Sequence, residues 1–573
     1  MKRIAVLASI LLALPMLGSP PLEDDVFHRG MVEGRMAGVA WGPTELYDFV
    51  GAPSRSASLM REYGAMPWFA ADDLRLRFFR PLSSAILASE LKLVGDRAWV
   101  SRLHSLLWFL VVLGLVVVVY QRFLEPRVAA LATLIYALAG GLLLPVSWPA
   151  ARHALICTVF ALLAFYWHVR ARDDGWRLGR VLAPLAFAVG LLAGELTLGA
   201  LALIGAWEWF TRTDRLRERI GAMVPIVIVT FGYLAFYAVQ GYGTRSTAAY
   251  VPLTLDVESS AAVLRHFGIL AGDLVAGTPS DIFGLAPVTV QTIGAVWGAL
   301  MVGAAWWLFS IVRPRLDARE ATAARWMGLA AVAAALPGTL AIVGGRVLAL
   351  ALVPASGVAS ILMLRGWTMR RDLHPSAAVR AIASLIVVII AFGRFVTGPV
   401  MRVAIGTSLS RVARVQQDQA AAVTPCRGVM VLVAAADPII ATYVPSMMTL
   451  KDHPPERVRV LSMAPVDHRI ERVTTTGFDL VLEQTPAART LWERLFRRAP
   501  LTAGTHVKIS SLDATVIEDR SGIATRMRFD FGEPLASPHL CFFQWRDEQV
   551  QPLAAPRPGE TTVLPHQRGP MGL

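Results

Sequence analysis

Residues 103–120 read LHSLLWFLVVLGLVVVVY and contain no Asp, Glu, Lys or Arg. A helix needs about 20 predominantly apolar residues to cross a bilayer, so this stretch predicts a membrane span. Similar runs occupy Val128–Val146, Ala154–Trp167, Val181–Phe210, Met223–Val239, Val288–Val312, Trp326–Val343, Val347–Leu364 and Ala381–Val396. Because the run from 181 to 210 can hold two short helices, these stretches and the first apolar segment, Ile4–Leu17, predict about eleven crossings.

The overall composition supports the same fold class. The chain has 573 residues, of which 55% are hydrophobic, and its mean hydropathy is +0.52. These values are too apolar for a water-soluble chain of this size. The sequence therefore predicts an α-helical polytopic membrane protein.

The formal charge of +13 has a specific distribution along the chain. Four of the 55 basic residues are lysines, and many of the 51 arginines lie in short loops at alternating ends of the predicted spans. Short basic loops are retained in the cytoplasm, so this charge indicates orientation and not a nucleic-acid site. These loops contain Arg122 and Arg127; Arg170, Arg172, Arg177 and Arg180; Arg212, Arg215, Arg217 and Arg219; Arg313, Arg315 and Arg319; and Arg370 and Arg371.

The same charge pattern predicts how the chain lies in the membrane. Lys2 and Arg3 favour a cytoplasmic N-terminus in a bacterial inner membrane, and the region after Val400 then lies in the periplasm. Residues 1–19 also fit a cleaved signal peptide, because a short apolar core is followed by the small residues Gly18 and Ser19. The predicted topology is the same for both alternatives.

Three segments outside the spans differ in composition. The loop from 20 to 102 is far longer than an ordinary connection, and its aromatic residues predict helices on the outer membrane surface. Residues 408–555 contain short strand-like runs and predict a small strand-rich α+β domain outside the cytoplasm. Residues 556–573 are rich in Pro and Gly and predict a disordered tail. The transmembrane domain is then residues 1–400.

The three cysteines cannot form a disulfide framework. Cys157 lies inside a predicted span, whereas Cys426 and Cys541 both belong to the predicted outer domain. An oxidising periplasm would allow these two thiols to pair, and the sequence alone leaves the pairing open.

Acidic and basic residues occur together at the predicted outer face. Glu23, Asp24 and Asp25 follow the first apolar segment, and Arg80, Arg152 and Arg346 lie at or near other outer exits. Transfer of a sugar from a lipid phosphate needs a carboxylate to accept a proton and cations to stabilise the departing phosphate. Alternatively, the carboxylates are ordinary solvated loop residues, and the arginines anchor interfacial helices or cap a turn.

Glu195 lies within an apolar run of about thirty residues, where an ionisable group costs about 3 kcal/mol unless it is paired or faces water. We expect it at the break between two short helices, open to the same outer cavity as Glu23 and His153. A structural pair with an arginine is the alternative. The sequence contains no metal-ligand spacing, phosphate loop or nucleophile elbow, and it leaves a divalent metal as an open question.

Several short motifs resemble the GT-C superfamily of membrane glycosyltransferases, especially the protein O-mannosyltransferases and their bacterial relatives. They are Asp24-Asp25 after the first span, Arg80-Pro81-Leu82 before the second, the turn from Trp148 to Arg152, Gly194-Glu195, and the segment from Arg346 to Gly357. The resemblance covers about residues 1–400. Gly194 replaces a lysine that is frequent in such relatives, and the strand-rich domain has no counterpart among them.

The resemblance implies an inverting transfer from a polyprenyl-phosphate sugar to an acceptor outside the cytoplasm. It assigns Asp24 or Asp25 as the general base, and Arg80, Arg152 and Arg346 as contacts of the donor phosphate. The sugar and the acceptor are not implied. Two other functions fit the sequence: a non-catalytic assembly or scaffold protein, and a transporter of envelope glycoconjugates. A transporter usually has polar groups along a path through its spans, and Glu195 is the one such residue that the predicted spans suggest.

Overall fold

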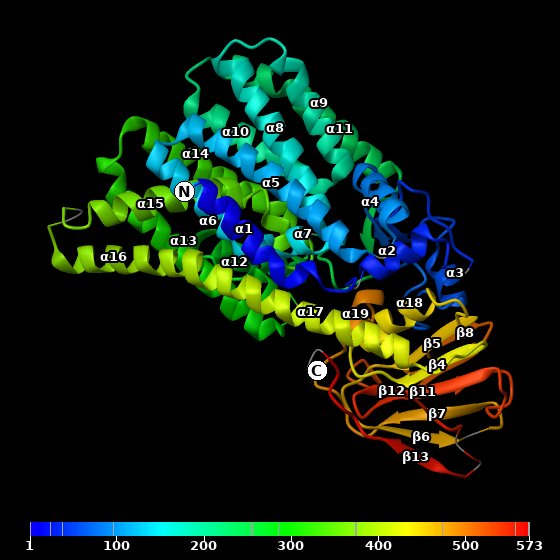
Figure 1. The fold of residues 1–573 in the computed structure, drawn as a ribbon. Coiled ribbons are helices and arrows are strands. Elements are labelled where there is room, and N and C mark those ends of the chain that lie inside the picture. Colours follow the sequence, from blue (N-terminus) through cyan, green and yellow to red (C-terminus); the bar gives the residue numbers. More distant parts are fainter. Residues whose placement is uncertain are drawn as a thin grey trace. The chain divides into compact units, whose positions relative to one another are not determined.

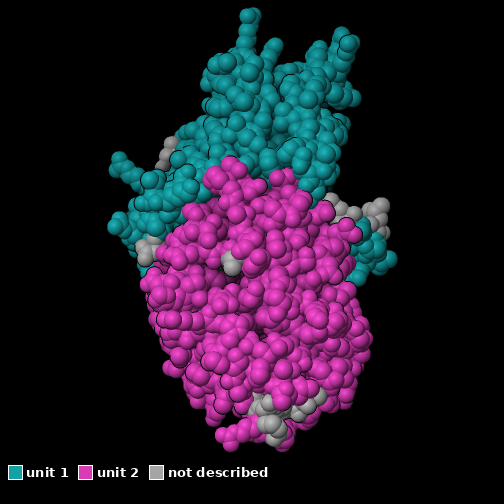
Figure 2. Space-filling model, turned by 90° about the vertical axis from the view of Figure 1, so that its right-hand side faces the viewer, with its two compact units in different colours: residues 1–18, 79–241, 250–408 teal, residues 19–78, 242–249, 409–573 magenta. Residues whose placement is uncertain are grey.

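The computed structural model describes residues 2–22, 24–36, 38–95, 97–252, 254, 256–284, 286–372, 375–472, 474–555, 557 and 559–570. The chain forms two compact units, which have different colours in Figure 2. Unit 1 contains residues 1–18, 79–241 and 250–408, and unit 2 contains residues 19–78, 242–249 and 409–573. The loop after the first helix and the C-terminal region therefore belong to the same unit.

Unit 1 is helical, as the apolar runs predict (Figure 1). Its α-helices are α1 Lys2–Leu17, α4 Pro81–Val94, α5 Ala98–Phe123, α6 Pro126–Leu138, α7 Leu143–Ser147, α8 His153–Asp173, α9 Gly179–Ala193, α10 Gly199–Thr211, α11 Leu216–Val239, α12 Val257–Ala276, α13 Val288–Val312, α14 Ala318–Ala335, α15 Leu352–Thr368, α16 Ala377–Phe392 and the start of α17 Gly398–Ala422. Short 3-10 helices lie between them: η1 Gly140–Leu142, η2 Pro149–Ala151, η3 Glu195–Leu198, η4 Ser280–Phe283, η5 Arg313–Arg315, η6 Leu336–Leu340 and η7 Gly345–Leu348. A π-helical turn, η8 Gly393–Thr397, joins α16 to α17.

Six helices among the described residues are long and apolar enough to cross a membrane, and a seventh span results if the bent pair α6 and η1–α7 is counted. They are Ala98–Phe123, Pro149–Asp173, Leu216–Val239, Val288–Arg315, Ala318–Leu340 and Ala377–Ala422. The polytopic helical class is confirmed, whereas the count of about eleven spans is not. The run from 181 to 210 forms two short helices of 15 and 13 residues, as predicted.

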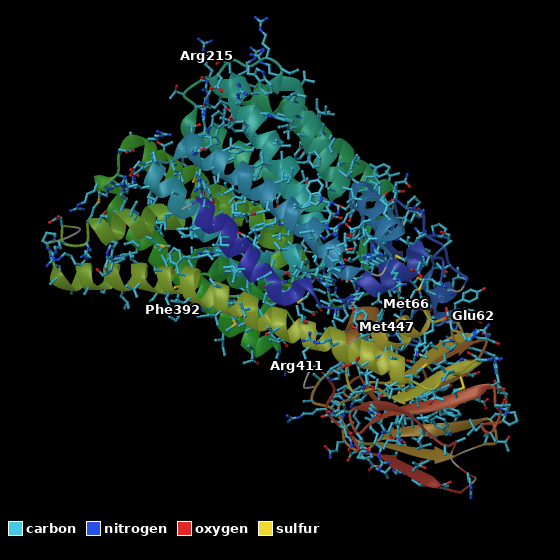
Figure 3. All side chains as sticks on the ribbon, in the orientation of Figure 1. Glu62, Met66, Arg215, Phe392, Arg411 and Met447 are labelled. Atoms are coloured by element: carbon cyan, nitrogen blue, oxygen red, sulfur yellow. A yellow bond between two sulfur atoms is a disulfide. The ribbon has the colours of Figure 1, made fainter. Side chains whose placement is uncertain are left out.

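The basic loops come together at one end of unit 1, which we call the basic end. Arg212 pairs with Asp173 at 2.8 Å, Arg365 pairs with Glu125 and Glu320 at 2.6 Å, and Arg122 pairs with Asp174. These contacts connect the ends of α5, α8, α10 and α15 with the starts of α6 and α14. Arg215, labelled in Figure 3, is exposed in the loop between α10 and α11. The alternation of basic loops in the sequence thus corresponds to one end of the bundle.

Helix α1 packs on α5 and α6 through one face. Ala5, Ser9 and Ala13 are buried at intervals of four residues, and small side chains at this spacing let membrane helices approach closely. The opposite face, which includes Leu7 and Leu11, is exposed. An apolar face of this kind is what a helix presents to lipid.

Glycines bring the backbones of α12 and α13 into contact. A Cβ atom on Gly298 would lie 1.8 Å from the carbonyl oxygen of Gly268 and 2.8 Å from the nitrogen of Gly272. A Cβ atom on Gly268 would lie 2.7 Å from the carbonyl oxygen of Ala295. These atoms belong to rigid backbone, so no side-chain rotation can make room for a methyl group.

We expect Gly298→Ala to lower the stability of the purified protein by about 1–3 kcal/mol, because an added methyl group forces two packed helices apart. Gly303→Ala, in the same helix, is the control, since a Cβ atom there meets nothing within 4 Å. Thermal unfolding in detergent measures both variants. Equal melting temperatures for Gly298→Ala and the parent protein would contradict this account of the helix contact.

Unit 2 contains three β-sheets and a few short helices. The helices are α2 Asp24–Val32, α3 Ala57–Glu62, α18 Val444–Met448 and α19 Leu491–Phe496, with a π-helical turn η9 Ile439–Tyr443 before α18. The strands are β1 Asp48–Val50, β2 Arg75–Arg77, β3 Gly243–Arg245, β4 Val429–Ala434, β5 Arg457–Ser462, β6 His468–Arg472, β7 Gly477–Leu482, β8 His506–Ile509, β9 Leu512–Arg520, β10 Ile523–Asp530, β11 Leu540–Arg546, β12 Gln549–Pro552 and β13 Thr561–Leu564.

The sheets differ in how their strands pair. The orders are β1-β2-β3, β13-β6-β7-β10-β9-β8 and β12-β11-β4-β5. In the last sheet, β11, β4 and β5 are parallel, so that β4, α18 and β5 form a crossover unit. The predicted strand-rich character is confirmed. However, β13 lies inside the segment predicted to be a disordered tail, where it pairs with β6.

A disulfide joins Cys426 and Cys541. It connects the segment before β4 to the start of β11, which are neighbours in the four-stranded sheet. The sequence left this pairing open, and the parallel registration of β4 with β11 is what brings the two cysteines together.

Candidate functional site

The 3-10 helices η1, η3 and η6 of unit 1 lie at the end opposite the basic end. Helices α6, α9 and α14 each begin at the basic end and lead to η1, η3 and η6, respectively. Elements η1 and η7 contact one another, as do η3 and η6. The residues that the sequence analysis selects in unit 1, Arg80, Arg152, His153, Glu195 and Arg346, lie in or beside the helix ends and turns of this part of the bundle.

Arg80 and Glu195 form an ion pair. Gly194 ends α9, and Glu195 begins η3, so the carboxylate lies at the predicted break between two short helices. Arg80 Nε donates to Glu195 Oε2 at 2.9 Å, and the Tyr237 hydroxyl donates to Oε1 at 3.1 Å. The structure therefore joins two residues that the sequence analysis selects separately, and it also confirms the alternative of a pair with an arginine.

Arg152 is held in a buried pair with Glu90 of α4. Its Nη1 and Nη2 donate to the two carboxylate oxygens at 2.5 and 3.0 Å, Nε donates to Ser105 Oγ at 2.9 Å, and Nη2 donates to the Ser101 carbonyl at 2.6 Å. His104 also contacts the Glu90 carboxylate. Burial alone would raise the pKa of Glu90, but the hydrogen bonds of His104 and Arg152 outweigh it and lower the pKa to about 2. With its donors used in this way, Arg152 fits a structural role.

Arg346 has a different environment. It lies in η7 directly after Gly345, whose N–H donates to Asp281 Oδ1 at 3.0 Å. Burial and the nearby charge of Asp273 raise the pKa of Asp281 to about 6, although Arg346 and the Gly345 N–H act in the opposite direction. Among the described residues, no carboxylate oxygen lies within 4 Å of the Arg346 guanidinium nitrogens, and Nη2 reaches the Ile342 carbonyl only at 3.5 Å.

Two further arginines were missed by the sequence analysis. Arg394 in η8 and Arg402 in α17 are each 1% exposed. Arg394 Nη2 donates to the Leu274 carbonyl in the last turn of α12, and Arg402 Nη1 donates to the Ala137 carbonyl in the last turn of α6 at 2.9 Å. Phe392, the last residue of α16, is labelled in Figure 3 and is 59% exposed. The helix that runs from α16 through η8 to α17 therefore has a buried face and an exposed face.

Both buried arginines retain donors without a hydrogen-bond partner among the described residues. These donors are Nε and Nη1 of Arg394 and Nε and Nη2 of Arg402. Among the described residues, no carboxylate lies within 4 Å of either guanidinium group. The partial negative charge of a helix C-terminus offsets part of each positive charge. The charge of the buried Asp273 also acts on Arg394, from beyond 4 Å.

Close backbone contacts join the segments that carry these residues. A Cβ atom on Gly345 would lie 2.2 Å from the Gly141 Cα atom, and one on Gly140 would lie 3.5 Å from the Gly398 Cα atom. A Cβ atom on Gly393 would lie 1.6 Å from the Ala276 carbonyl oxygen. Elements η7, η1, α17, η8 and α12 therefore form a continuous series of contacts. Arg346, Arg394 and Arg402 lie on these contacting segments, and we call the three residues the basic cluster.

The remaining predicted residues are placed as follows. Asp24 and Asp25 begin α2 in unit 2, where Asp25 Oδ2 accepts from the Leu22 N–H at 3.2 Å, whereas Glu23 lies outside the described residues. Carboxylates at the first turn of a helix are favoured by its dipole. His153 begins α8, directly after Arg152. Among the residues that the structure describes, no group of three or more His, Cys, Asp or Glu side chains has an arrangement suited to a metal ion.

Loss of the Glu90 carboxylate should be strongly destabilising. We expect Glu90→Gln to lower the stability of the protein by about 3–5 kcal/mol, because it leaves the buried Arg152 guanidinium without a counter-charge. Glu258→Gln, at an exposed position in the first turn of α12, is the control. Thermal unfolding in detergent is the measurement. A double variant, Glu90→Gln with Arg152→Gln, should recover part of the loss, and no recovery would argue against direct coupling of the pair.

Comparisons with known proteins give structural matches only. No family model and no curated protein matches the chain. Among solved structures, the chain is similar to ArnT from Cupriavidus metallidurans bound to undecaprenyl phosphate, with 14% identity and a TM-score of 0.38 over 79% of this chain and 88% of that chain. It is also similar to the Archaeoglobus fulgidus oligosaccharyltransferase tethered with an acceptor peptide, with 12% identity and a TM-score of 0.40 over 81% and 63% of the two chains.

A third match is the oligosaccharyltransferase AglB from Archaeoglobus fulgidus in complex with an inhibitory peptide and a dolichol phosphate. Here the identity is 11% and the TM-score 0.40, over 80% of this chain and 64% of that chain.

Proposed function

We propose that this protein is a membrane glycosyltransferase of the GT-C kind, and that it moves a sugar from a polyprenyl-phosphate donor to an acceptor outside the cytoplasm. We further propose that the basic cluster binds the phosphate of the donor. The observation that carries the proposal is the lack of a close ion-pair partner for these arginines. Three guanidinium groups have no carboxylate within 4 Å among the described residues, whereas Arg80 and Arg152 are each paired with a glutamate.

The chemistry needs cations that are not already neutralised. The acceptor hydroxyl attacks the anomeric carbon of the sugar, the bond from that carbon to the phosphate oxygen breaks, and the lipid phosphate leaves with an additional negative charge. Guanidinium groups stabilise that charge through charge-assisted hydrogen bonds, and the effect is large where water is excluded. A bound phosphate also stabilises each buried guanidinium group, because it supplies acceptors for N–H groups that otherwise have none.

The proton of the acceptor hydroxyl needs a base. Following the resemblance stated above, we assign this role to Asp24 or Asp25. An ionised carboxylate can accept this proton as the glycosidic bond forms. Asp281 is a second carboxylate near the basic cluster, and its raised pKa also lies in a range that suits a general base.

Turnover by the reconstituted protein tests these assignments. With a series of polyprenyl-phosphate sugars as donors, we expect Asp24→Asn or Asp25→Asn to abolish transfer without weakening donor binding, because a base acts only on the acceptor proton. Arg346→Gln and Arg402→Gln should each raise the KM for the donor about tenfold or more, which corresponds to the loss of a charged hydrogen bond worth roughly 1.5–3 kcal/mol. Arg215→Gln, at the exposed basic end, is the matched control and should leave the KM unchanged.

Binding of farnesyl phosphate, farnesol and inorganic phosphate separates the contributions of lipid and phosphate without knowledge of the sugar. We expect farnesyl phosphate to bind more tightly than either of the other two, and Arg346→Gln to reduce its affinity while leaving farnesol binding unchanged. Equal loss for farnesyl phosphate and farnesol would contradict a phosphate site at Arg346. Full transfer by both aspartate variants would contradict the proposed base.

A further inference from the structure

Unit 2 contains a serine and a histidine in direct contact, outside the site described above. Ser462 is the last residue of β5, and His468 is the first residue of β6. Ser462 Oγ and His468 Nε2 are 2.8 Å apart, and the two residues are 7% and 2% exposed. A nucleophile and a base within hydrogen-bond distance are the first requirement of an activated serine.

The histidine ring is also oriented by a third group. It makes a second hydrogen bond to the backbone of Val466, which favours the protonated form of the ring, as a bond to a carbonyl oxygen does. In the tautomer with the proton on Nδ1, Nε2 is the acceptor for the Ser462 hydroxyl. An orienting group of this kind fixes the tautomer that removes a proton from the nucleophile. Burial, followed by the charge of His566, lowers the pKa of His468 to about 4, so the ring is neutral at physiological pH.

The position of Ser462 in the sheet suits a reactive group. Strand β5 is parallel to β4, and Ser462 pairs with Ala434 at the carboxyl end of both strands. Side chains at the carboxyl ends of parallel strands are where α/β sheets bind their ligands. The Ala464 N–H donates to Ser462 Oγ at 3.2 Å, so the backbone helps to fix the position of this hydroxyl.

A small cavity adjoins the serine. Its volume is about 50 Å³, and its lining includes Ser462 together with the aromatic side chains Trp68, Phe69 and Trp492. Thr490 and Glu493 are polar members of the same lining. A water molecule needs about 10–15 Å³ when volume is measured in this way, so the cavity holds a group of only a few heavy atoms. A two-carbon acyl group has that size.

A second buried serine in unit 2, Ser511, differs from Ser462 in its surroundings. Ser511 is also 7% exposed, but its Oγ accepts from Arg459 Nε at 2.9 Å and has no histidine beside it. A buried serine that only completes a hydrogen bond, as Ser511 does, needs no neighbouring base. Ser462 has a base, an orienting backbone group and a cavity together.

From this geometry we infer that Ser462 and His468 form a nucleophile–base dyad that accepts a small acyl group, such as acetyl, from an ester. Ser462 Oγ attacks the ester carbonyl carbon while His468 Nε2 takes the hydroxyl proton. The ester C–O bond then breaks, and the departing alcohol takes that proton from His468. A water molecule or a second alcohol releases the acyl group from Ser462 by the reverse sequence, with His468 again as the base.

A fluorophosphonate probe tests the inference on the full chain in detergent, because it phosphonylates an activated serine and releases fluoride. We expect a single adduct on Ser462 by mass spectrometry, and hydrolysis of 4-nitrophenyl acetate by the same preparation. Ser462→Ala should abolish both, and His468→Gln should slow adduct formation by about 100-fold or more, the usual contribution of a general base. Ser511→Ala is the matched control and should leave both unchanged.

Folding of each variant is checked by its melting temperature and by the intact Cys426–Cys541 bond in a non-reducing digest. If His468→Gln does not fold, the adduct on the parent protein and its loss in Ser462→Ala still decide the question. A folded parent protein that neither reacts with the probe nor cleaves the acetate ester would overturn the inference. An adduct that persists in Ser462→Ala would overturn it as well. Because neither readout involves a sugar donor, these results are independent of the proposed glycosyl transfer.

Discussion

The interior of unit 1 depends on the compensation of buried guanidinium groups. Burial removes these groups from bulk water, so each positive charge needs a carboxylate, a carbonyl oxygen or a ligand. Arg152 finds Glu90, and Arg80 finds Glu195. Arg394 and Arg402 donate to the carbonyl ends of α12 and α6, and the charge of Asp273 acts on Arg394 from beyond 4 Å. This difference divides the arginines into those that hold the helices in place and those that retain the capacity to bind an anion.

Glycine allows close backbone contact between the segments that carry these arginines. At Gly345, a Cβ atom would lie 2.2 Å from the Gly141 Cα atom, which leaves no space for a side chain. A larger residue at Gly345 would move η7 and η1 apart. The cluster is thus a product of backbone contact between segments that are distant in the sequence, and not of any local motif.

Much of the helical architecture could be predicted from hydropathy, because the apolar runs and the arginine-rich loops are local signals. Glu195 could be placed at a helix break for the same reason, since Gly194 precedes it in an apolar run.

Arg394 could also have been selected from the sequence. It is a charged residue inside the predicted span 381–396, and charged residues inside spans are functional candidates. Partners such as Glu90 could not be predicted, because a single sequence does not reveal which helices are neighbours. Long-range pairing also explains why residues 19–78 belong with the C-terminal region, and why part of the predicted tail forms β13.

The composition of unit 2 from three separate segments has a consequence for biosynthesis. Residues 19–78 are made early, but their compact unit also needs residues 242–249 and 409–573, which are made last. Trp68 and Phe69, which are buried in the finished unit, therefore remain uncovered while the ribosome completes most of the chain. The membrane helices can insert in order as they emerge, whereas unit 2 can close only after translation is nearly complete. A nascent chain stalled before β4 would thus carry a finished bundle and an early segment that is still unfolded.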